Sequence, residues 1–137
     1  MAATKKNSAQ DLDFQMVFYE GILTKNPSHV DVLVLLGEIY TKKGLYKKGL
    51  RMDKKLARLQ PDNPIVHYNL ACSHSLLGDL SSSLEALDRA VRLGYDDVVF
   101  MCKDPDLVNL RKDERFTGLL QRIRKSCIPA QDPNQCP

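Results

Sequence analysis

The chain has no tryptophan and no long apolar run. Aromatic residues make up 7% of its 137 residues, and the longest apolar run, VLVLL at residues 32–36, is far shorter than the roughly 20 residues that span a bilayer. The first ten residues, MAATKKNSAQ, carry two lysines but no apolar segment of the kind that follows them in a secretory signal. We therefore expect no membrane insertion, no export and a cytoplasmic location.

Cysteine is sparse and irregularly spaced. Cys72, Cys102, Cys127 and Cys136 form no CxxC pair, and no histidine stands at a usual zinc spacing from them. We expect free thiols in a reducing compartment, and neither a metal nor another cofactor. A disulfide between Cys127 and Cys136 is the alternative.

No catalytic constellation is visible. His67 and His74 share one face of a predicted helix, but that face is the predicted core, which favours neutral, hydrogen-bonded histidines over metal ligands. Two pairs of aspartates precede predicted helices, where an aspartate caps free N–H groups: Asp96 with Asp97, and Asp104 with Asp106. The sequence thus predicts a protein that is not an enzyme.

The chain contains an internal repeat with a period of 34 residues. In the first copy, Leu36, Gly37 and Tyr40 continue an apolar stripe at helical spacing, Gly44 ends that helix, and a second helix runs to the break at QPDNP. The offset aligns Val32 with Val66, Leu36 with Leu70, Gly44 with Gly78, Leu50 with Leu84 and Leu59 with Leu93. This period, with two helices in each copy, predicts a helix–turn–helix repeat protein.

Gly37 lies on the apolar face of the first helix, where a glycine costs about 0.5–1 kcal/mol relative to alanine. Its counterpart one period later is Ala71, which is also small. A missing side chain lets two helices approach closely. We therefore expect Gly37 at the crossing of the two helices of its repeat.

The first copy resembles the tetratricopeptide repeat (TPR) family in Leu36, Gly37, Tyr40, Gly44 and Pro61. The second copy departs from the pattern where a histidine, His74, replaces the tyrosine. The resemblance implies an all-α, right-handed α-solenoid of about seven helices without a sheet, and we expect a monomer.

The expected organisation is a disordered tail (1–10), a TPR domain (11–126) and a second disordered tail (127–137). Within the domain we expect an N-terminal capping helix (11–27), two repeats (30–63 and 64–97), and C-terminal capping helices (98–126) that resemble the closing module of bacterial TPR arrays.

The resemblance also implies a protein-interaction module, an adaptor or scaffold that binds a peptide or helix of another protein in a concave groove. The groove residues implied are Asp31, Val34, Glu38, Thr41, Lys42, Ile65, Tyr68, Asn69 and Cys72. Tyr68 is the predicted apolar anchor and Asn69 the predicted polar contact, while Asp31 and Glu38 favour a basic ligand. The alternative is that Tyr68 and Val34 only pack against neighbouring helices.

A second candidate surface is basic. Residues 41–59, TKKGLYKKGLRMDKKLARL, contain eight lysines and arginines and one acid, within a chain whose net charge is only +3. Five of the cations form one outward stripe on the predicted helix: Lys47, Arg51, Lys54, Lys55 and Arg58. The stripe suits a polyanion or an acidic protein, but nucleic acid is disfavoured because no aromatic residues interleave it. A purely solvated face is the other interpretation.

Overall fold

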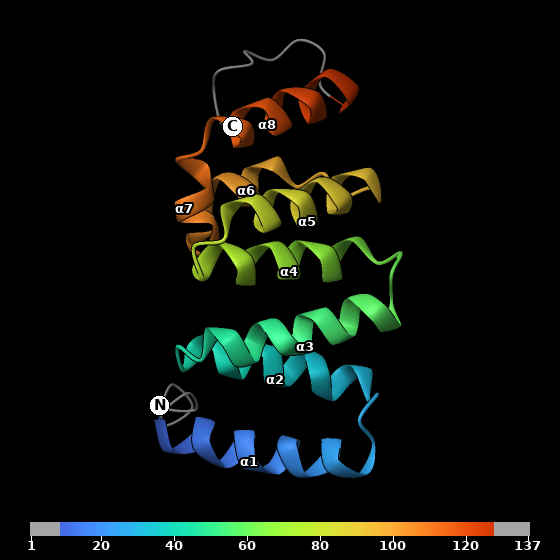
Figure 1. Ribbon diagram of the computed structural model, residues 1–137, viewed down its shortest axis with the longest axis vertical. Helices are drawn as coiled ribbons and strands as arrows, with labels where there is room; N and C mark the ends of the chain where they lie inside the picture. The colour runs from blue at the N-terminus through green and yellow to red at the C-terminus, as the bar shows by residue number, and fades with distance from the viewer. Residues whose placement is uncertain (1–8, 128–137) are drawn as a thin grey trace, which may run out of the picture. The chain divides into compact units, whose positions relative to one another are not determined.

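The computed structural model describes residues 9–127, and every regular element in that range is helical (Figure 1). The elements are α1 (Ala9–Lys25), α2 (Val30–Lys42), α3 (Tyr46–Leu59), α4 (Pro64–Leu76), α5 (Leu80–Arg92), α6 (Val98–Lys103), the 3₁₀ turn η2 (Pro105–Leu107), α7 (Val108–Arg111) and α8 (Glu114–Cys127). The predicted all-α repeat fold is confirmed. Residues 9–127 hold eight α-helices where about seven were expected, and three of them lie in the closing segment. The predicted tails lie almost entirely outside the described residues.

The chain divides into two compact units, residues 1–60 and 61–137, which we call the N-terminal and the C-terminal unit. The N-terminal unit contains α1 to α3, and the C-terminal unit contains α4 to α8. The two predicted repeats therefore fall into different units. Among residues 9–127, no helix combines the length and apolar character needed to cross a membrane.

In the N-terminal unit, α2 and α3 cross at two glycines. A Cβ atom added to Gly37 would lie 3.5 Å from Oδ1 of Asp53 and 3.8 Å from Cβ of Met52 on α3. A Cβ atom added to Gly49 would lie 3.7 Å from the carbonyl oxygen of Gly37. The predicted place of Gly37 at the helix crossing is therefore confirmed, and Gly49 is its counterpart on the second helix.

The first helix, α1, packs against α2 through one of its faces. Met16, Tyr19, Ile22 and Leu23 surround the buried side chains Val32, Leu36 and Tyr40. Polar contacts support the same interface, because Tyr40 donates a hydrogen bond to Glu20 and Lys43 pairs with Asp13. Helix α1 thus packs onto α2 in this unit, and its role as a capping helix stays a prediction.

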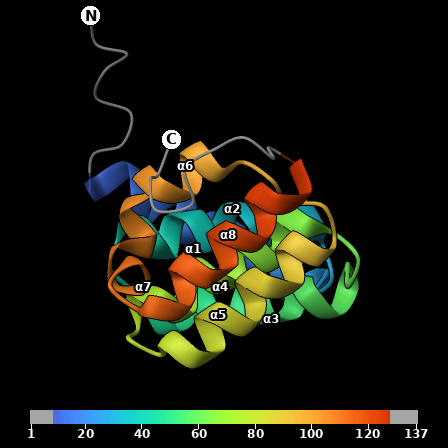
Figure 2. The same cartoon turned by 90° about the horizontal axis from the view of Figure 1, so that it is seen from above.

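The C-terminal unit has one continuous core. Helices α4 and α5 cross where the hydroxyl of Ser83 donates a 2.7 Å hydrogen bond to the carbonyl of Ala71. Helix α8 runs beside α5 (Figure 2), and its Phe116 and Leu119 join Leu87 in this core. Arg111 on α7 donates hydrogen bonds to the carbonyls of Met101 and Asp104, which ties α7 to the end of α6. The short closing helices are therefore integral to this unit.

The capping prediction holds for one member of each aspartate pair. Asp97 accepts a hydrogen bond from the N–H of Phe100 at the start of α6, and Asp104 accepts one from the N–H of Asp106 at the start of η2. Asp96 is exposed and Asp106 is half-buried, and neither is the capping residue of the helix that follows. One side chain suffices because each helix start has a single N-cap position.

The two histidines of α4 differ from each other in burial. His74 is largely buried beside Asp79, as expected for a core histidine. His67 is only half-buried, and its ring lies 2.7 Å from the carbonyl oxygen of Pro61. Both histidines were expected in the core, and the burial of His74 fits this expectation better than that of His67.

The cysteines differ in part from expectation. Cys72 is a buried thiol outside any disulfide, but Cys102 is disulfide-bonded, so the expectation of free thiols is wrong at Cys102. The alternative pair, Cys127 with Cys136, lies outside the side chains that the structure describes. Cysteine spacing alone carries no information on pairing, because the fold decides which thiols meet.

Candidate interaction surfaces

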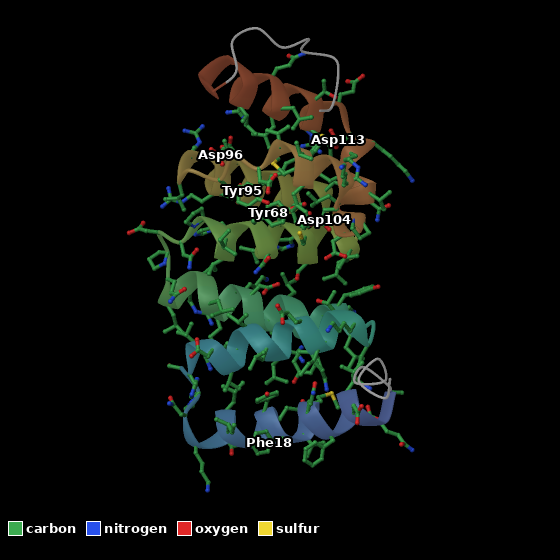
Figure 3. All side chains as sticks on the ribbon, turned by 180° about the vertical axis from the view of Figure 1, so that it is seen from behind. Phe18, Tyr68, Tyr95, Asp96, Asp104 and Asp113 are labelled. Atoms are coloured by element: carbon green, nitrogen blue, oxygen red, sulfur yellow. The ribbon has the colours of Figure 1, made fainter. Side chains whose placement is uncertain are left out.

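The centre of the C-terminal unit is an aromatic cluster built on Tyr68 of α4. Its ring stacks on the ring of Tyr95 with centroids 4.3 Å apart, and the ring of Phe100 lies 6.0 Å away in a tilted arrangement. Figure 3 shows Tyr68 and Tyr95 side by side, with Asp104 next to them. Tyr68 is only 3% exposed, whereas 49% of Phe100 is exposed. The cluster therefore has a buried base and an open rim.

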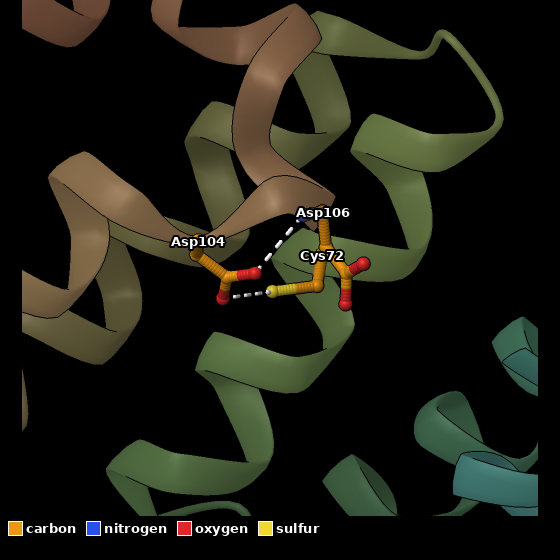
Figure 4. A group of neighbouring side chains, drawn as sticks. All are labelled: Cys72, Asp104 and Asp106. Carbon is orange, nitrogen blue, oxygen red and sulfur yellow. Dashed lines mark hydrogen bonds between the residues drawn. The ribbon is translucent and has the colours of Figure 1, made fainter. Parts of the chain in front are cut away.

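A buried carboxylate holds this cluster together. The hydroxyl of Tyr68 donates a 2.7 Å hydrogen bond to Oδ2 of Asp104. The thiol of Cys72 lies 3.7 Å from the same oxygen, and Figure 4 shows this contact. The other oxygen, Oδ1, accepts the N–H of Asp106. One side chain thus caps η2 and fastens it to α4.

The pKa values of the groups around Asp104 are raised, which favours the protonated, neutral form of each group. Burial, followed by the hydrogen bond to Asp104, raises the pKa of Tyr68 far above its usual range, so the tyrosine stays a proton donor. Burial also raises the pKa of Tyr95 to about 12. Burial and the neighbouring charge of Asp104 raise the pKa of Asp106.

Within residues 9–127, one group of side chains has a spacing that would suit a metal ion. It consists of Cys72, Asp104 and Asp106, whose ligand atoms lie within 4.8 Å of one another. Both oxygens of Asp104 already accept hydrogen bonds from the chain, and the thiol of Cys72 points at one of them. Hydrogen bonding within the fold accounts for the side chains of Asp104 and Cys72, and we assign the group no metal.

The groove residues predicted on α4 separate into two groups. Ile65 is 54% exposed and Asn69 is also exposed, whereas Tyr68 and Cys72 are buried. The expectation of Tyr68 as an open anchor is corrected, because α6 and η2 lie over it. The alternative, in which Tyr68 packs against neighbouring helices, describes what the structure shows. The contact with Asp104, 36 residues away, left no local signal in the sequence.

The groove residues predicted on α2 form a mixed surface of the N-terminal unit. Asp31, Glu38 and Lys42 are exposed, and Val34 and Thr41 are partly buried. The hydroxyl of Thr41 donates a 2.9 Å hydrogen bond to the carbonyl of Gly37, so this side chain serves the helix crossing. The three charged residues are the part of this set available to a ligand.

The basic stripe exists on α3. Lys47, Arg51, Lys54 and Arg58 are exposed and Lys55 is partly buried, and none of the five forms an ion pair with another described residue. Lys48, which lies beside the stripe in sequence, sits over the ring of Tyr40 at 5.6 Å from its centroid. The stripe is thus an open cationic surface.

The paired helices, the 34-residue period and the absence of strands in residues 9–127 define an α-helical repeat protein of the helix–turn–helix kind. No family model matches the chain. A chloroplastic protein of Arabidopsis thaliana is 33% identical over 92 residues, which cover 65% of this chain and 28% of that protein. The Peroxisomal targeting signal receptor of Pichia angusta is 26% identical over 112 residues, which cover 82% of this chain and 19% of the receptor.

The fold also matches a solved structure. The crystal structure of MamA superposes with a TM-score of 0.68 at 22% identity, covering 91% of this chain and 73% of that chain. The chain spans less than a third of the length of each of the two curated relatives. Together with the repeat, these similarities show that the chain has a helical fold like that of tetratricopeptide-repeat proteins.

Proposed function

We propose that this chain is a protein-interaction module, an adaptor or scaffold that binds an extended or helical segment of another protein on the exposed face formed by α4 and α6. The observation that carries the proposal is a pair of half-exposed apolar side chains beside Tyr68, namely Ile65 and Phe100, which we call the rim. Ile65 precedes Tyr68 by one helical turn on the same face of α4, and Phe100 lies against the ring of Tyr68 from α6. Both rim residues are about half exposed.

The rim has the chemistry of a small binding surface. Ile65 and Phe100 offer apolar area over a base that is already packed, so little conformational entropy is lost when a ligand covers them. The amide of Asn69 beside them can both donate and accept a hydrogen bond from a peptide backbone. Tyr68 contributes as the rigid support of the rim instead of as the predicted anchor.

The predicted contribution of α2 stays a prediction of its own. Asp31 and Glu38 are exposed acids, and they favour a ligand that carries a basic residue. Glu38→Lys tests this contribution separately from the α4 and α6 face. The monomeric state and the cytoplasmic location stay predictions, and the disulfide at Cys102 is uncommon for a reducing compartment.

The test uses the full chain as bait and measures the affinity of each captured protein with matched variants. Ile65→Ser and Asn69→Ala are expected to weaken binding at least about tenfold, because each removes a contact at the centre of the surface. Leu59→Ser is the control, since Leu59 is a similarly exposed apolar residue on α3. Circular dichroism and a thermal melt confirm that each variant folds. Partners that bind Ile65→Ser and Asn69→Ala as well as the parent would show that this face is not the site.

The basic stripe supports a second candidate function, the binding of a polyanion or of an acidic protein. Its carrying observation is four exposed cations on one side of α3 without ion-pair partners among the described residues. Nucleic acid stays disfavoured for the lack of aromatic residues between them. Both candidates are binding functions, and neither needs a catalytic group.

A further inference from the structure

Helix α1 carries apolar side chains on two faces, and only one of them is used within the described structure. Leu12, Ile22 and Leu23 are buried or partly buried, while Phe14, Val17 and Phe18 are 73%, 65% and 55% exposed. The rings of Phe14 and Phe18 stack with centroids 6.3 Å apart, and Phe18 is marked on α1 in Figure 3. A helix that is apolar on both sides is normally covered on both sides.

We propose that this outer face of α1, which consists of Phe14, Val17, Phe18 and Gly21, is a contact for a second copy of this chain, with the two α1 helices packed antiparallel. The four residues follow one another at spacings of three, one and three, which places them on a single side of the helix. Gly21 is exposed, and a Cβ atom added there would meet nothing within 4 Å. The face therefore has a projecting ring at one end and a bare position at the other.

These features are complementary to themselves under a two-fold axis. When the axis passes between residues 17 and 18, Phe14 of one copy faces Gly21 of the second copy, and Val17 faces Phe18. Each large ring thus meets a smaller side chain or none, and all four positions are covered. A parallel arrangement would place Phe14 against Phe14 and would leave the two glycines facing each other.

The charges at the two ends of α1 favour the same arrangement. Asp11 lies in the first turn and Lys25 in the last turn, and both are exposed. Antiparallel packing brings Asp11 of one copy near Lys25 of the second copy, whereas parallel packing brings like charges together. The opposed helix dipoles act in the same direction.

The size of the contact sets the expected affinity. A helix of 17 residues is about 25 Å long, so a pair of single helices buries an area at the low end for specific interfaces. The dimer is therefore expected to form at tens of micromolar and to dissociate on dilution. The chain would then be a monomer in dilute solution.

Sedimentation equilibrium of the full chain from about 5 to about 500 µM tests the proposal, because the average mass should rise from one copy to two over this range. Phe14→Asp should hold the chain monomeric throughout. Val108→Asp is the control, since Val108 is an apolar residue on α7 that is 47% exposed, and this variant should dimerise like the parent. A parent that stays monomeric at the highest concentration overturns the proposal and leaves the face to a partner of different sequence. A dimer that survives Phe14→Asp overturns it too.

Three further variants test the geometry without disturbing the fold. Gly21→Leu fills the bare position opposite Phe14 and should weaken the dimer at least about tenfold, while the melting temperature stays the same or rises because a helical glycine is lost. Asp11→Lys should weaken the dimer by like-charge contact, and adding Lys25→Asp should restore it. A dimer unaffected by Gly21→Leu, or a double variant no better than Asp11→Lys alone, rules out the antiparallel arrangement.

Discussion

Single side chains decide how closely the helices of this protein approach. At Gly37 the neighbouring Asp53 and Met52 stand at ordinary van der Waals distance from where a Cβ atom would lie, so there is room for one methyl group and for little more. The first copy of the repeat thus needs a small residue at this position, and the second copy has Ala71. On the opposite side, Gly49 leaves space for the carbonyl of Gly37 and for Thr41.

A small and a large substitution at Gly37 should therefore differ sharply. Gly37→Leu is expected to lower the free energy of unfolding by about 1–3 kcal/mol, because the longer side chain overpacks the crossing against Asp53 and Met52. Gly37→Ala should be nearly neutral, since the added Cβ fits and the helix gains propensity. Urea denaturation of both variants measures the difference. Equal midpoints for Gly37→Leu and the parent would contradict close packing at this position.

At the scale of elements, capping side chains and buried polar links determine where helices begin and what they contact. Asn63 accepts the N–H of Ile65 at the start of α4, and Asp79 accepts the N–H of Ser82 at the start of α5. Asp88 joins two helices, since it pairs with Arg92 on α5 and with Arg122 on α8. Partial burial opposes ionisation of Asp88, but hydrogen bonds from both arginines outweigh it and lower its pKa. Such links hold short helices that would not be stable alone.

The neighbouring aspartates before α6 allow a matched test of capping. Asp97→Ala should cost about 1 kcal/mol of stability, because the N–H of Phe100 loses its acceptor. Asp96→Ala removes the same charge one residue earlier and should leave stability within about 0.5 kcal/mol of the parent. Thermal unfolding of the two variants side by side gives the comparison. If Asp96→Ala lowers the stability more than Asp97→Ala does, Asp97 is not the residue that caps α6.

At the scale of the whole molecule, the positive charge is concentrated in one segment of the chain. The net charge of the chain is +3, yet residues 41–59 alone contain eight cations and one acid. Exposed cations on one helix side create a local positive potential even when the total charge is small. The cationic surface on α3 is therefore the feature most sensitive to ionic strength.

Retention on heparin measures whether this concentration of charge binds polyanions. We expect elution at a salt concentration well above that of a neutral protein, and loss of retention when Lys47, Arg51, Lys54 and Arg58 are changed to glutamate. The control variant also changes four exposed cations to glutamate, so that its net charge is the same, but at positions outside α3: Lys25, Arg89, Lys103 and Lys112. If both variants elute alike, retention follows net charge and the stripe is a solvated face.

The sequence by itself determined the features that local pattern controls. The 34-residue period, the helix crossing at Gly37 and the turn at Gly44, where φ is 77°, follow from helical spacing and from the conformations that glycine allows. The tertiary structure alone decided which apolar faces are covered. Tyr68 is buried because Asp104, distant in sequence, brings η2 onto α4, and Phe14 stays exposed because α2 covers only the other side of α1. Periodicity shows that a helix has an apolar face, but only contacts between distant segments determine what lies against it.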